Sequence, residues 1–312
     1  MDEVLEVTLF EEKLKSPLIL GSGTLGEAKH NLIEALKAGA GAVTTRTIRV
    51  DNTKRKPIRP AYYIEKKGDA LIYMLNADNN NLTPWEYWVR NVKEIEKYGP
   101  LIVSLSARNP EDCNTIIPAF EANDPPSFFE LNFSCPHSAR MYGKISYKNV
   151  EKALEIIKGN TKKPVFLKLS VNNIDYNRLS ELESSNLVDA YVISNTLGPG
   201  LKIDIKTRKS VLGCLFGGVS GPSIKPFVLR AIYELKQKVE KPIIGVGGIE
   251  TAEDVLEYLI LGCDAVQIYT RAHIEGVGVF AKINKNLKNL LEEMNETVES
   301  IRGTFREDCY ER

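Results

Sequence analysis

The sequence has no long apolar run and no excess of charge of either sign. No stretch of the 312 residues approaches the roughly 18 consecutive apolar residues that a membrane-spanning helix needs. The first residues, Met1 to Glu6, are acidic and unlike a secretory signal peptide. The 41 basic and 41 acidic side chains give a formal net charge of zero. This balance gives no reason to expect binding to nucleic acid or to a membrane.

Cysteine is also scarce. The chain has five cysteines, an odd number, and no two of them have C-x-x-C spacing. This pattern argues against a disulfide framework, a structural zinc site and a cysteine-ligated Fe–S cluster within the chain. It fits a reducing compartment, so we expect a cytoplasmic protein without a metal site.

Short apolar segments alternate with segments of helical periodicity. Strands of a parallel sheet that is covered on both faces are typically continuous apolar runs. Eight such runs are present, at residues 17–23, 42–47, 101–106, 128–133, 165–170, 190–195, 242–248 and 265–270. Their number and spacing predict a (β/α)8 TIM barrel. Because no linker interrupts the pattern, we expect one barrel domain over residues 1–294 and a charged C-terminal tail over residues 295–312.

The second predicted strand is followed by a long insertion, residues 48–83, and segments of that length usually have structure or function of their own. Within it, residues 62–74 predict a β-hairpin with its turn near Gly68-Asp69. The run Thr83-Pro84-Trp85-Glu86 predicts a helix start with threonine as N-cap, and we expect this helix to reach Gly99.

Gly21 to Gly26 forms a literal G-x-G-x-x-G between a predicted strand and a helix. The pattern is typical of Rossmann folds, which have an acidic residue about 20 positions later, whereas Arg46 lies near that place here. A Rossmann half accounts for three strands only. We therefore interpret the motif as a barrel loop whose backbone amides can lie against a flat cofactor.

The fourth predicted strand delivers an amide, a thiol and an imidazole to its carboxyl end. Pro136 ends the strand, and Asn132, Cys135 and His137 surround that point. The carboxyl ends of barrel strands form the active site in enzymes of this fold. An ordinary buried thiol is the alternative interpretation of Cys135. Together, the three groups can hold a planar polar ring and move a proton.

Other polar residues lie at or near predicted strand ends. Lys168 lies in an apolar strand, where its ammonium needs a partner at the strand's end, unless it only extends toward solvent. Asn76 and Asn195-Thr196 add amide groups that can match a cyclic imide, although single asparagines are also common in turns. Gly247-Gly248 and Tyr269-Thr270 follow strands seven and eight, where barrels often bind phosphate.

Together these motifs resemble the class 1 (soluble) dihydroorotate dehydrogenase family over roughly residues 5–290, with features of the dihydropyrimidine dehydrogenase flavin domain. The motifs that carry the resemblance are Leu20–Thr24, Glu130–Pro136, Lys168–Ser170, Asn195–Thr196, Gly217–Pro226 and Gly245–Ile249. The resemblance implies an FMN-dependent oxidoreductase that oxidises dihydroorotate to orotate in pyrimidine biosynthesis. Hydride would pass from ring C6 to flavin N5, and Cys135 would be the acid/base at C5.

The resemblance also implies roles for further residues. Those implied to bind FMN are Gly21, Ser22, Gly23, Thr45, Lys168, Ser220, Gly221, Gly247, Gly248, Tyr269 and Thr270. Those implied to bind the substrate are Arg46, Asn76, Asp78, Asn132, His137, Asn195 and Thr196.

Three residues depart from the pattern of the orotate enzymes. Arg46 replaces a lysine, Asp78 lies where small apolar residues surround the substrate carboxylate, and His137 replaces an asparagine. At the last two positions the sequence is similar to the dihydropyrimidine enzymes, whose ring carries no carboxylate. Dihydroorotate is still the first expectation, because the pattern of motifs along the whole chain is closest to the orotate enzymes. A dihydropyrimidine of the uracil or thymine type is the second.

We expect a homodimer, with any Fe–S/FAD electron-transfer group on a separate partner subunit. Two rival interpretations remain open. One is a flavin-binding partner subunit without turnover of its own. The other is a barrel isomerase or aldolase that uses Lys168 as a Schiff base, which would be colourless.

Overall fold

A closed barrel of eight parallel strands forms the centre of the molecule, which confirms the predicted TIM barrel. The computed structural model describes residues 3–50, 56–78, 83–106, 110–133 and 146–307. The barrel order is β10-β15-β16-β3-β4-β7-β8-β9. The strands are β3 (Leu18–Leu20), β4 (Ala42–Thr44), β7 (Leu101–Ser106), β8 (Phe128–Asn132), β9 (Val165–Leu169), β10 (Ala190–Ile193), β15 (Ile243–Val246) and β16 (Ala265–Ile268).

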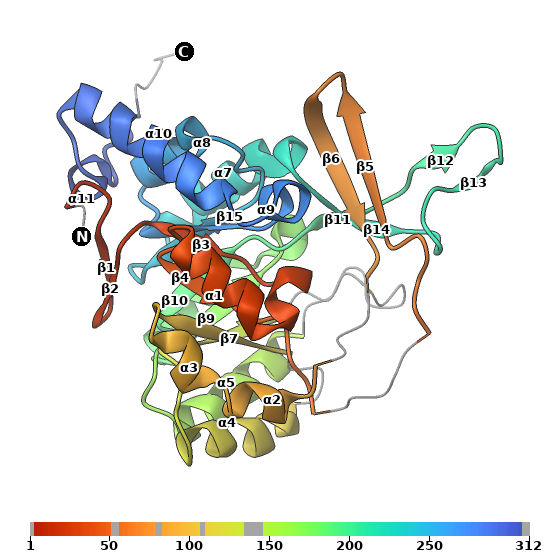
Figure 1. The fold of residues 1–312 in the computed structure, drawn as a ribbon. Helices are drawn as coiled ribbons and strands as arrows, with labels where there is room; N and C mark the ends of the chain where they lie inside the picture. The colour runs from red at the N-terminus through yellow and green to blue at the C-terminus, as the bar shows by residue number, and fades with distance from the viewer. Residues whose placement is uncertain (1–2, 51–55, 79–82, 107–109, 134–145, 308–312) are drawn as a thin grey trace.

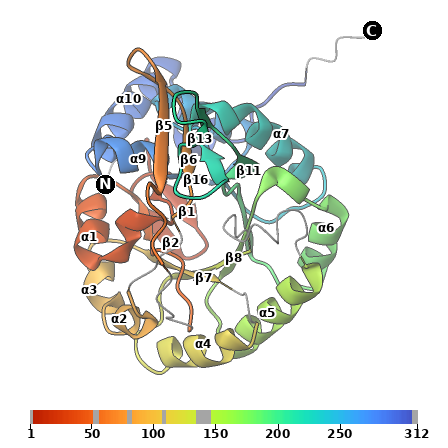
Figure 2. The same ribbon diagram turned by 90° about the vertical axis from the view of Figure 1, so that its right-hand side faces the viewer.

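Helices surround the barrel as a ring (Figure 2). The α-helices are α1 (Lys29–Lys37), α2 (Trp85–Val89), α3 (Val92–Glu96), α4 (Cys113–Glu121), α5 (Tyr147–Asn160), α6 (Tyr176–Ser184), α7 (Lys225–Lys236), α8 (Ala252–Leu261), α9 (Thr270–Glu275), α10 (Val279–Met294) and α11 (Val298–Ile301). Short 3-10 helices are η1 (Thr24–Glu27), η2 (Pro110–Asp112), η3 (Val171–Asn173) and η4 (Pro222–Ile224). Apolar helix faces and the strands share one continuous core, as expected for a two-layer α/β barrel.

The insertion after β4 contains the predicted hairpin, β5 (Tyr62–Lys67) and β6 (Ala70–Asn76), with its turn at Gly68-Asp69. The hairpin joins two strands from the segment after β10, β11 (Leu197–Gly200) and β14 (Gly217–Ser220), in the order β11-β14-β6-β5. This sheet rises from the mouth of the barrel (Figure 1). Because β6 pairs with β14, Asn76 is brought beside Gly218 at the base of the sheet.

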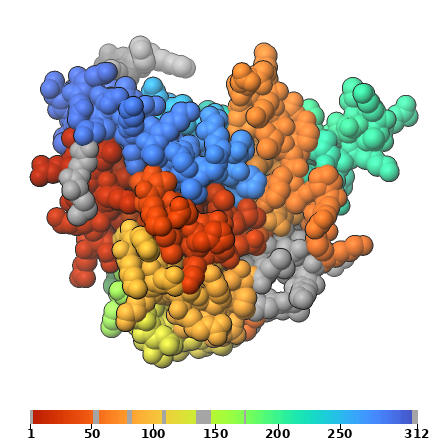
Figure 3. Space-filling view, viewed as in Figure 1, coloured from red at the N-terminus to blue at the C-terminus, as the bar shows by residue number. Residues whose placement is uncertain are grey.

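A second small hairpin, β12 (Ile203–Asp204) and β13 (Lys209–Ser210), extends from this sheet and stands clear of the main body (Figure 3). It carries exposed apolar side chains, among them Ile203 and Ile205. We did not predict β11 to β14 from the glycine-rich sequence of this segment.

The prediction of one helix from Thr83 to Gly99 is wrong in two respects. Pro84 rather than Thr83 is the N-cap, because the Thr83 hydroxyl donates a 2.7 Å hydrogen bond to the carbonyl of Glu27. The helix is also divided into α2 and α3. At the break, the Asn91 side-chain amide donates to the Tyr87 carbonyl at 2.6 Å and so competes with the helical backbone bonds.

Part of the predicted tail packs against the barrel. Val298 and Ile301 of α11 are 1% and 5% exposed. The backbone N–H of Val298 donates to the Val4 carbonyl, and that of Phe305 donates to the Ile260 carbonyl. None of the helices in the described ranges has the length and apolar character that would let it span a bilayer.

Candidate active site

One cavity lies at the carboxyl ends of the barrel strands, beneath the sheet β11-β14-β6-β5. It encloses about 1280 Å³ of space, part of it open to solvent. It is lined by almost all of the predicted site residues that the structure describes, namely Gly21, Ser22, Gly23, Arg46, Asn76, Asp78, Asn132, Lys168, Asn195, Thr196, Ser220, Gly221, Gly247, Gly248, Tyr269 and Thr270. The structure thus brings together residues from both ends of the sequence.

Of the predicted site residues that the structure describes, Thr45 alone is not on this wall. Cys135 and His137 lie outside the described residues. Thr45 is fully buried between β4 and β7, where its hydroxyl accepts a 3.0 Å hydrogen bond from the backbone N–H of Ser104. Within the described ranges, no group of three or more His, Cys, Asp or Glu side chains is arranged to hold a metal ion.

A buried ion pair underlies the cavity floor. The Lys168 ammonium donates to Gln267 Oε1 at 2.7 Å and lies 3.6 Å from Glu130 Oε2. Gln267 in turn donates to the same Glu130 oxygen at 2.8 Å. Burial lowers the pKa of Lys168, and the charge of Glu130 opposes that shift. Lys168, Glu130 and Gln267 therefore form a closed set of contacts at the floor of the cavity.

The asparagine amides are joined in a second set of contacts. Asn132 Nδ2 donates to Thr47 Oγ1 at 2.9 Å, and Asn195 Nδ2 donates to Asn132 Oδ1 at 3.2 Å. Asn195 Oδ1 accepts from the Thr196 backbone N–H at 2.7 Å. These bonds fix which end of each amide faces its neighbour, so the cavity presents a defined set of donors and acceptors.

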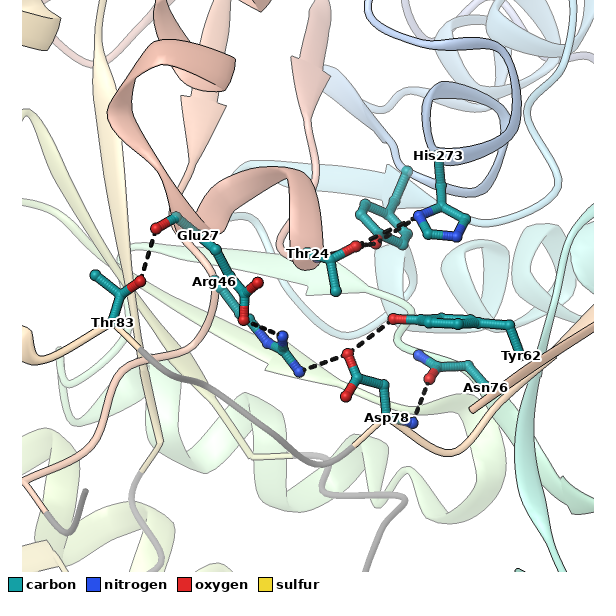
Figure 4. A network of polar contacts seen from close by, with 9 residues as sticks. Thr24, Glu27, Arg46, Tyr62, Asn76, Asp78, Thr83 and His273 are labelled. Atoms are coloured by element: carbon teal, nitrogen blue, oxygen red, sulfur yellow. Dashed lines mark hydrogen bonds and ion pairs between the residues drawn. The ribbon is translucent and has the colours of Figure 1, made fainter. Parts of the chain in front are cut away.

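Arg46 lies at the edge of the cavity between two acidic residues (Figure 4). Its Nη1 pairs with Glu27 of η1, and its Nη2 donates to Asp78 Oδ2 at 2.9 Å. The same Asp78 oxygen accepts a 2.8 Å hydrogen bond from the Tyr62 hydroxyl. The Asp78 backbone N–H donates to Asn76 Oδ1 at 2.7 Å. This cluster ties the hairpin to the barrel and fixes the amide of Asn76.

A histidine lies behind the rim (Figure 4). His273 Nδ1 is 3.2 Å from the Tyr269 hydroxyl and 3.4 Å from Thr24 Oγ1. Its ring packs against the Tyr62 ring with 4.8 Å between centroids. Burial lowers the pKa of His273 and raises the pKa values of Tyr62 and Tyr269. All three rings are therefore neutral near pH 7.

Two glycine turns and a hydroxyl pair form the far end of the cavity. Gly247 and Gly248 follow β15 with φ of 135° and 72°, which glycine adopts far more readily than other residues. Among the described residues, their backbone N–H groups have no backbone hydrogen-bond acceptor. The Thr270 hydroxyl donates to Ser220 Oγ at 2.9 Å and so joins the ends of β16 and β14. Backbone N–H groups and hydroxyls of this kind suit a phosphate.

Several residues of the site were not predicted. Thr47, Tyr62 and Gln267 line the cavity, and Glu130 lies directly behind it. Glu130 and Gln267 had a usable signal, because each is a polar residue inside an apolar strand. Thr47 also had a signal, because it is the last residue of the predicted strand 42–47 and so stands at a carboxyl end. Tyr62 had none, because its position depends on how the insertion folds over the barrel.

Comparisons with known proteins agree with the sequence motifs. A family profile described as dihydroorotate dehydrogenase matches residues 4–291. Relatives are named as the catalytic subunit of dihydroorotate dehydrogenase B (NAD(+)). The relative from Pyrococcus furiosus is 36% identical, with 93% of this chain and 94% of the relative aligned. The relative from Thermoplasma volcanium is 34% identical, with 96% and 97% aligned. The resemblance inferred from the motifs is confirmed, and the chain belongs to the dihydroorotate dehydrogenase family.

Proposed function

We propose that this protein oxidises dihydroorotate to orotate, a step of pyrimidine biosynthesis, with FMN as its flavin. The observation that carries the proposal is the cavity itself. It combines a buried cation, oriented amides and glycine turns at the carboxyl ends of the barrel strands. The relatives' names support the reaction, and the family supports a flavin cofactor.

The chemistry of the cavity fits FMN. Gly247, Gly248 and the hydroxyls of Ser220 and Thr270 supply uncharged donors for the phosphate. At the other end, Lys168 supplies a cation for the polar edge of the ring system. When bound, FMN supplies the acceptor for the hydride that leaves ring C6.

The amides suit the polar edges of the substrate ring. Asn76 Oδ1 is occupied by the Asp78 backbone N–H, and among the described residues Asn76 Nδ2 has no acceptor. Asn76 can therefore donate to a ring carbonyl. Asn132 and Asn195 face the same cavity with their mutual orientation fixed by a hydrogen bond. Such preorganisation reduces the ordering that substrate binding requires.

The proton at C5 requires a base, and we assign this role to Cys135. A thiol can accept a proton as thiolate, and its pKa can be tuned by a nearby positive charge. His137, two residues away, is proposed to contact the substrate. The oxidation is balanced because one hydride leaves C6 and one proton leaves C5.

The surroundings of Arg46 favour a second candidate substrate. Both Nη atoms of Arg46 contact carboxylates, those of Glu27 and Asp78. Arg46 therefore carries one positive charge between two negative ones, and a substrate carboxylate would have to compete with Asp78 for it. A dihydropyrimidine without a carboxylate avoids this competition and is the second candidate.

The relatives are named as catalytic subunits of an NAD(+)-dependent enzyme, which implies another subunit in those proteins. We propose that this chain likewise transfers its electrons to a partner subunit that carries Fe–S and FAD groups. We also retain the expectation of a homodimer, which light scattering of the purified chain tests directly.

Anaerobic titration of the FMN-loaded chain with dihydroorotate tests the proposal. We expect the visible flavin band to bleach with one equivalent of substrate. If dihydroorotate leaves the band unchanged while dihydrouracil bleaches it, the second substrate replaces the first. If neither compound reduces bound FMN, the proposed oxidation is wrong and the flavin-binding partner remains. A protein that takes up no flavin contradicts the cofactor assignment.

A further inference from the structure

Glu130 is a fully buried carboxylate that no part of the proposed chemistry uses. It lies in β8 with 0% exposure and does not line the cavity. A buried carboxylate is costly unless its oxygens are paired and hydrogen-bonded. Both oxygens of Glu130 have partners, and these lead toward different parts of the cavity.

The first branch leads to the cavity floor. Glu130 Oε2 accepts from Gln267 Nε2 at 2.8 Å and lies 3.6 Å from the Lys168 ammonium. Gln267 Oε1 accepts from Lys168 at 2.7 Å. Lys168 is itself only 4% exposed, so its positive charge depends on this nearby negative charge.

The second branch leads to the asparagine amides. Glu130 Oε1 accepts a 3.0 Å hydrogen bond from the Ser104 hydroxyl. Since Ser104 has one hydroxyl proton, its 3.1 Å contact with Thr47 Oγ1 requires Thr47 to donate. Thr47 Oγ1 therefore accepts from Asn132 Nδ2, at 2.9 Å. The carboxylate, which can only accept, sets the direction of every bond in this branch.

We propose that Glu130 is a positioning residue that acts on both halves of the site, by keeping Lys168 protonated beside the flavin and by fixing the amide of Asn132 toward the substrate. The inference rests on the proposed binding of FMN and a pyrimidine ring. It deepens that proposal by naming one buried group that affects both the midpoint potential of the flavin and the affinity for the ligand. Neither effect requires Glu130 to touch the flavin or the substrate.

The first effect has a pH signature. Without its counter-charge, a fully buried ammonium loses its proton more easily. The charge of Lys168 in a Glu130→Gln protein is then present at low pH and lost as pH rises. A cation beside a flavin favours its reduced, more negative state. The midpoint potential of the variant, measured relative to wild type, therefore becomes more negative as pH increases from 6 to 9.

The experiment uses the FMN-loaded chain and two readouts. The midpoint potential of bound FMN is measured against reference dyes, and the orotate dissociation constant is measured from the change in the flavin spectrum.

Ser104→Ala separates the branches because it leaves the Glu130–Lys168 pair intact. We expect it to weaken orotate binding roughly five- to tenfold and to leave the potential unchanged. Gln267→Met disturbs the other branch while the carboxylate remains, and it should shift the potential in the same pH-dependent sense as Glu130→Gln.

Glu96→Gln is the matched control. Glu96 is another partly buried carboxylate that contacts β7 and the start of β8, where it accepts from the backbone N–H groups of Leu101 and Ser127. It lies outside the cavity lining, so both readouts should match wild type.

The outcomes are distinct. A potential difference that is constant between pH 6 and 9 in both Glu130→Gln and Gln267→Met overturns the flavin branch. Unchanged orotate affinity in Ser104→Ala overturns the ligand branch. Either result, in a protein that dihydroorotate still reduces, leaves the proposed function standing. A wild-type chain that takes up no FMN removes both the proposed function and this inference.

Discussion

At the scale of single residues, Tyr62 connects the hairpin to the barrel through one hydroxyl. That hydroxyl donates to Asp78 Oδ2, which also binds Arg46. In Tyr62→Phe the carboxylate loses one donor in a half-buried position. We expect the free energy of unfolding to fall by about 1–2 kcal/mol and the KM for the dihydropyrimidine to rise, with bound flavin unchanged. Urea unfolding and steady-state kinetics measure these effects.

The neighbouring Tyr63 provides the control. Its hydroxyl donates to Glu65 on the same strand, away from the cavity. Tyr63→Phe should change stability by no more than about 0.5 kcal/mol and leave KM unchanged. Equal effects of the two substitutions would show that the Asp78 contact has no special role.

His273 makes the folding stability of the protein depend on pH. Burial lowers its pKa below the ordinary value of 6.5, so between the two values the unfolded chain binds more protons than the folded one. The contribution to stability is complete above pH 6.5 and is lost as the pH falls through the folded-state pKa. We expect thermal unfolding scans to show a falling midpoint from pH 7 to pH 5, and His273→Gln to flatten this slope. His30→Gln, at an exposed position in α1, is the control; a slope that persists unchanged in His273→Gln would assign it to other groups.

Residue-level prediction from the sequence succeeded where a side chain conflicts with its surroundings. Lys168 was identified because an ammonium in an apolar strand needs a partner. The same rule, applied to Glu130 and Gln267, would have revealed the complete buried network. Tyr62 could not be found in this way, because a tyrosine at the start of an amphipathic hairpin conflicts with nothing. Its contact with Asp78 depends on tertiary packing alone.

At the scale of elements, the pairing of β14 with β11 brings Gly218 against Thr196, the residue before β11. A Cβ at Gly218 would lie 2.3 Å from Thr196 Oγ1 and 2.7 Å from its Cβ. Gly218→Ala should therefore displace Thr196, lower stability by about 1–3 kcal/mol and weaken orotate binding. Differential scanning calorimetry and the flavin spectrum measure the two effects.

Gly159→Ala is the contrasting substitution. Gly159 lies in α5, and a Cβ at this position would meet no atom within 4 Å. Alanine there should raise stability by roughly 0.5–1 kcal/mol and leave ligand binding unchanged. If both glycine variants behaved alike, close packing at Gly218 would not explain the result.

The strands and turns that could be predicted are those whose local sequence carries a strong signal. Each barrel strand was found because a strand covered on both faces is a continuous apolar run. The hairpin turn at Gly68-Asp69 has local chemistry that specifies it, and it is present. By contrast, β11 and β14 are short and rich in glycine. They form strands because β14 pairs with β6 and β11 in turn pairs with β14.

At the scale of the whole molecule, the alternation of eight strands with helices was sufficient to predict the closed barrel, because parallel strands need crossover helices and the sheet then closes on itself. The packing of the C-terminal segment was not predictable in this way. Its sequence is highly charged, and only two of its described apolar side chains, Val298 and Ile301, are buried against the rest of the chain. Charge composition alone therefore suggested a tail.

The C-terminal segment should contribute measurably to the stability of the barrel. Ile301 is 5% exposed, and α11 is anchored on both sides by backbone bonds to Val4 and Leu259. We expect Ile301→Ala to lower the free energy of unfolding by about 2–4 kcal/mol, because it leaves a cavity between the segment and the barrel. Met294→Ala, at a side chain that is 49% exposed, should change it by no more than about 0.5 kcal/mol. Because no described residue of the segment lines the cavity, FMN content and orotate affinity should be unchanged in both variants. An Ile301→Ala protein as stable as wild type would mean that the segment detaches without cost, as a true tail does.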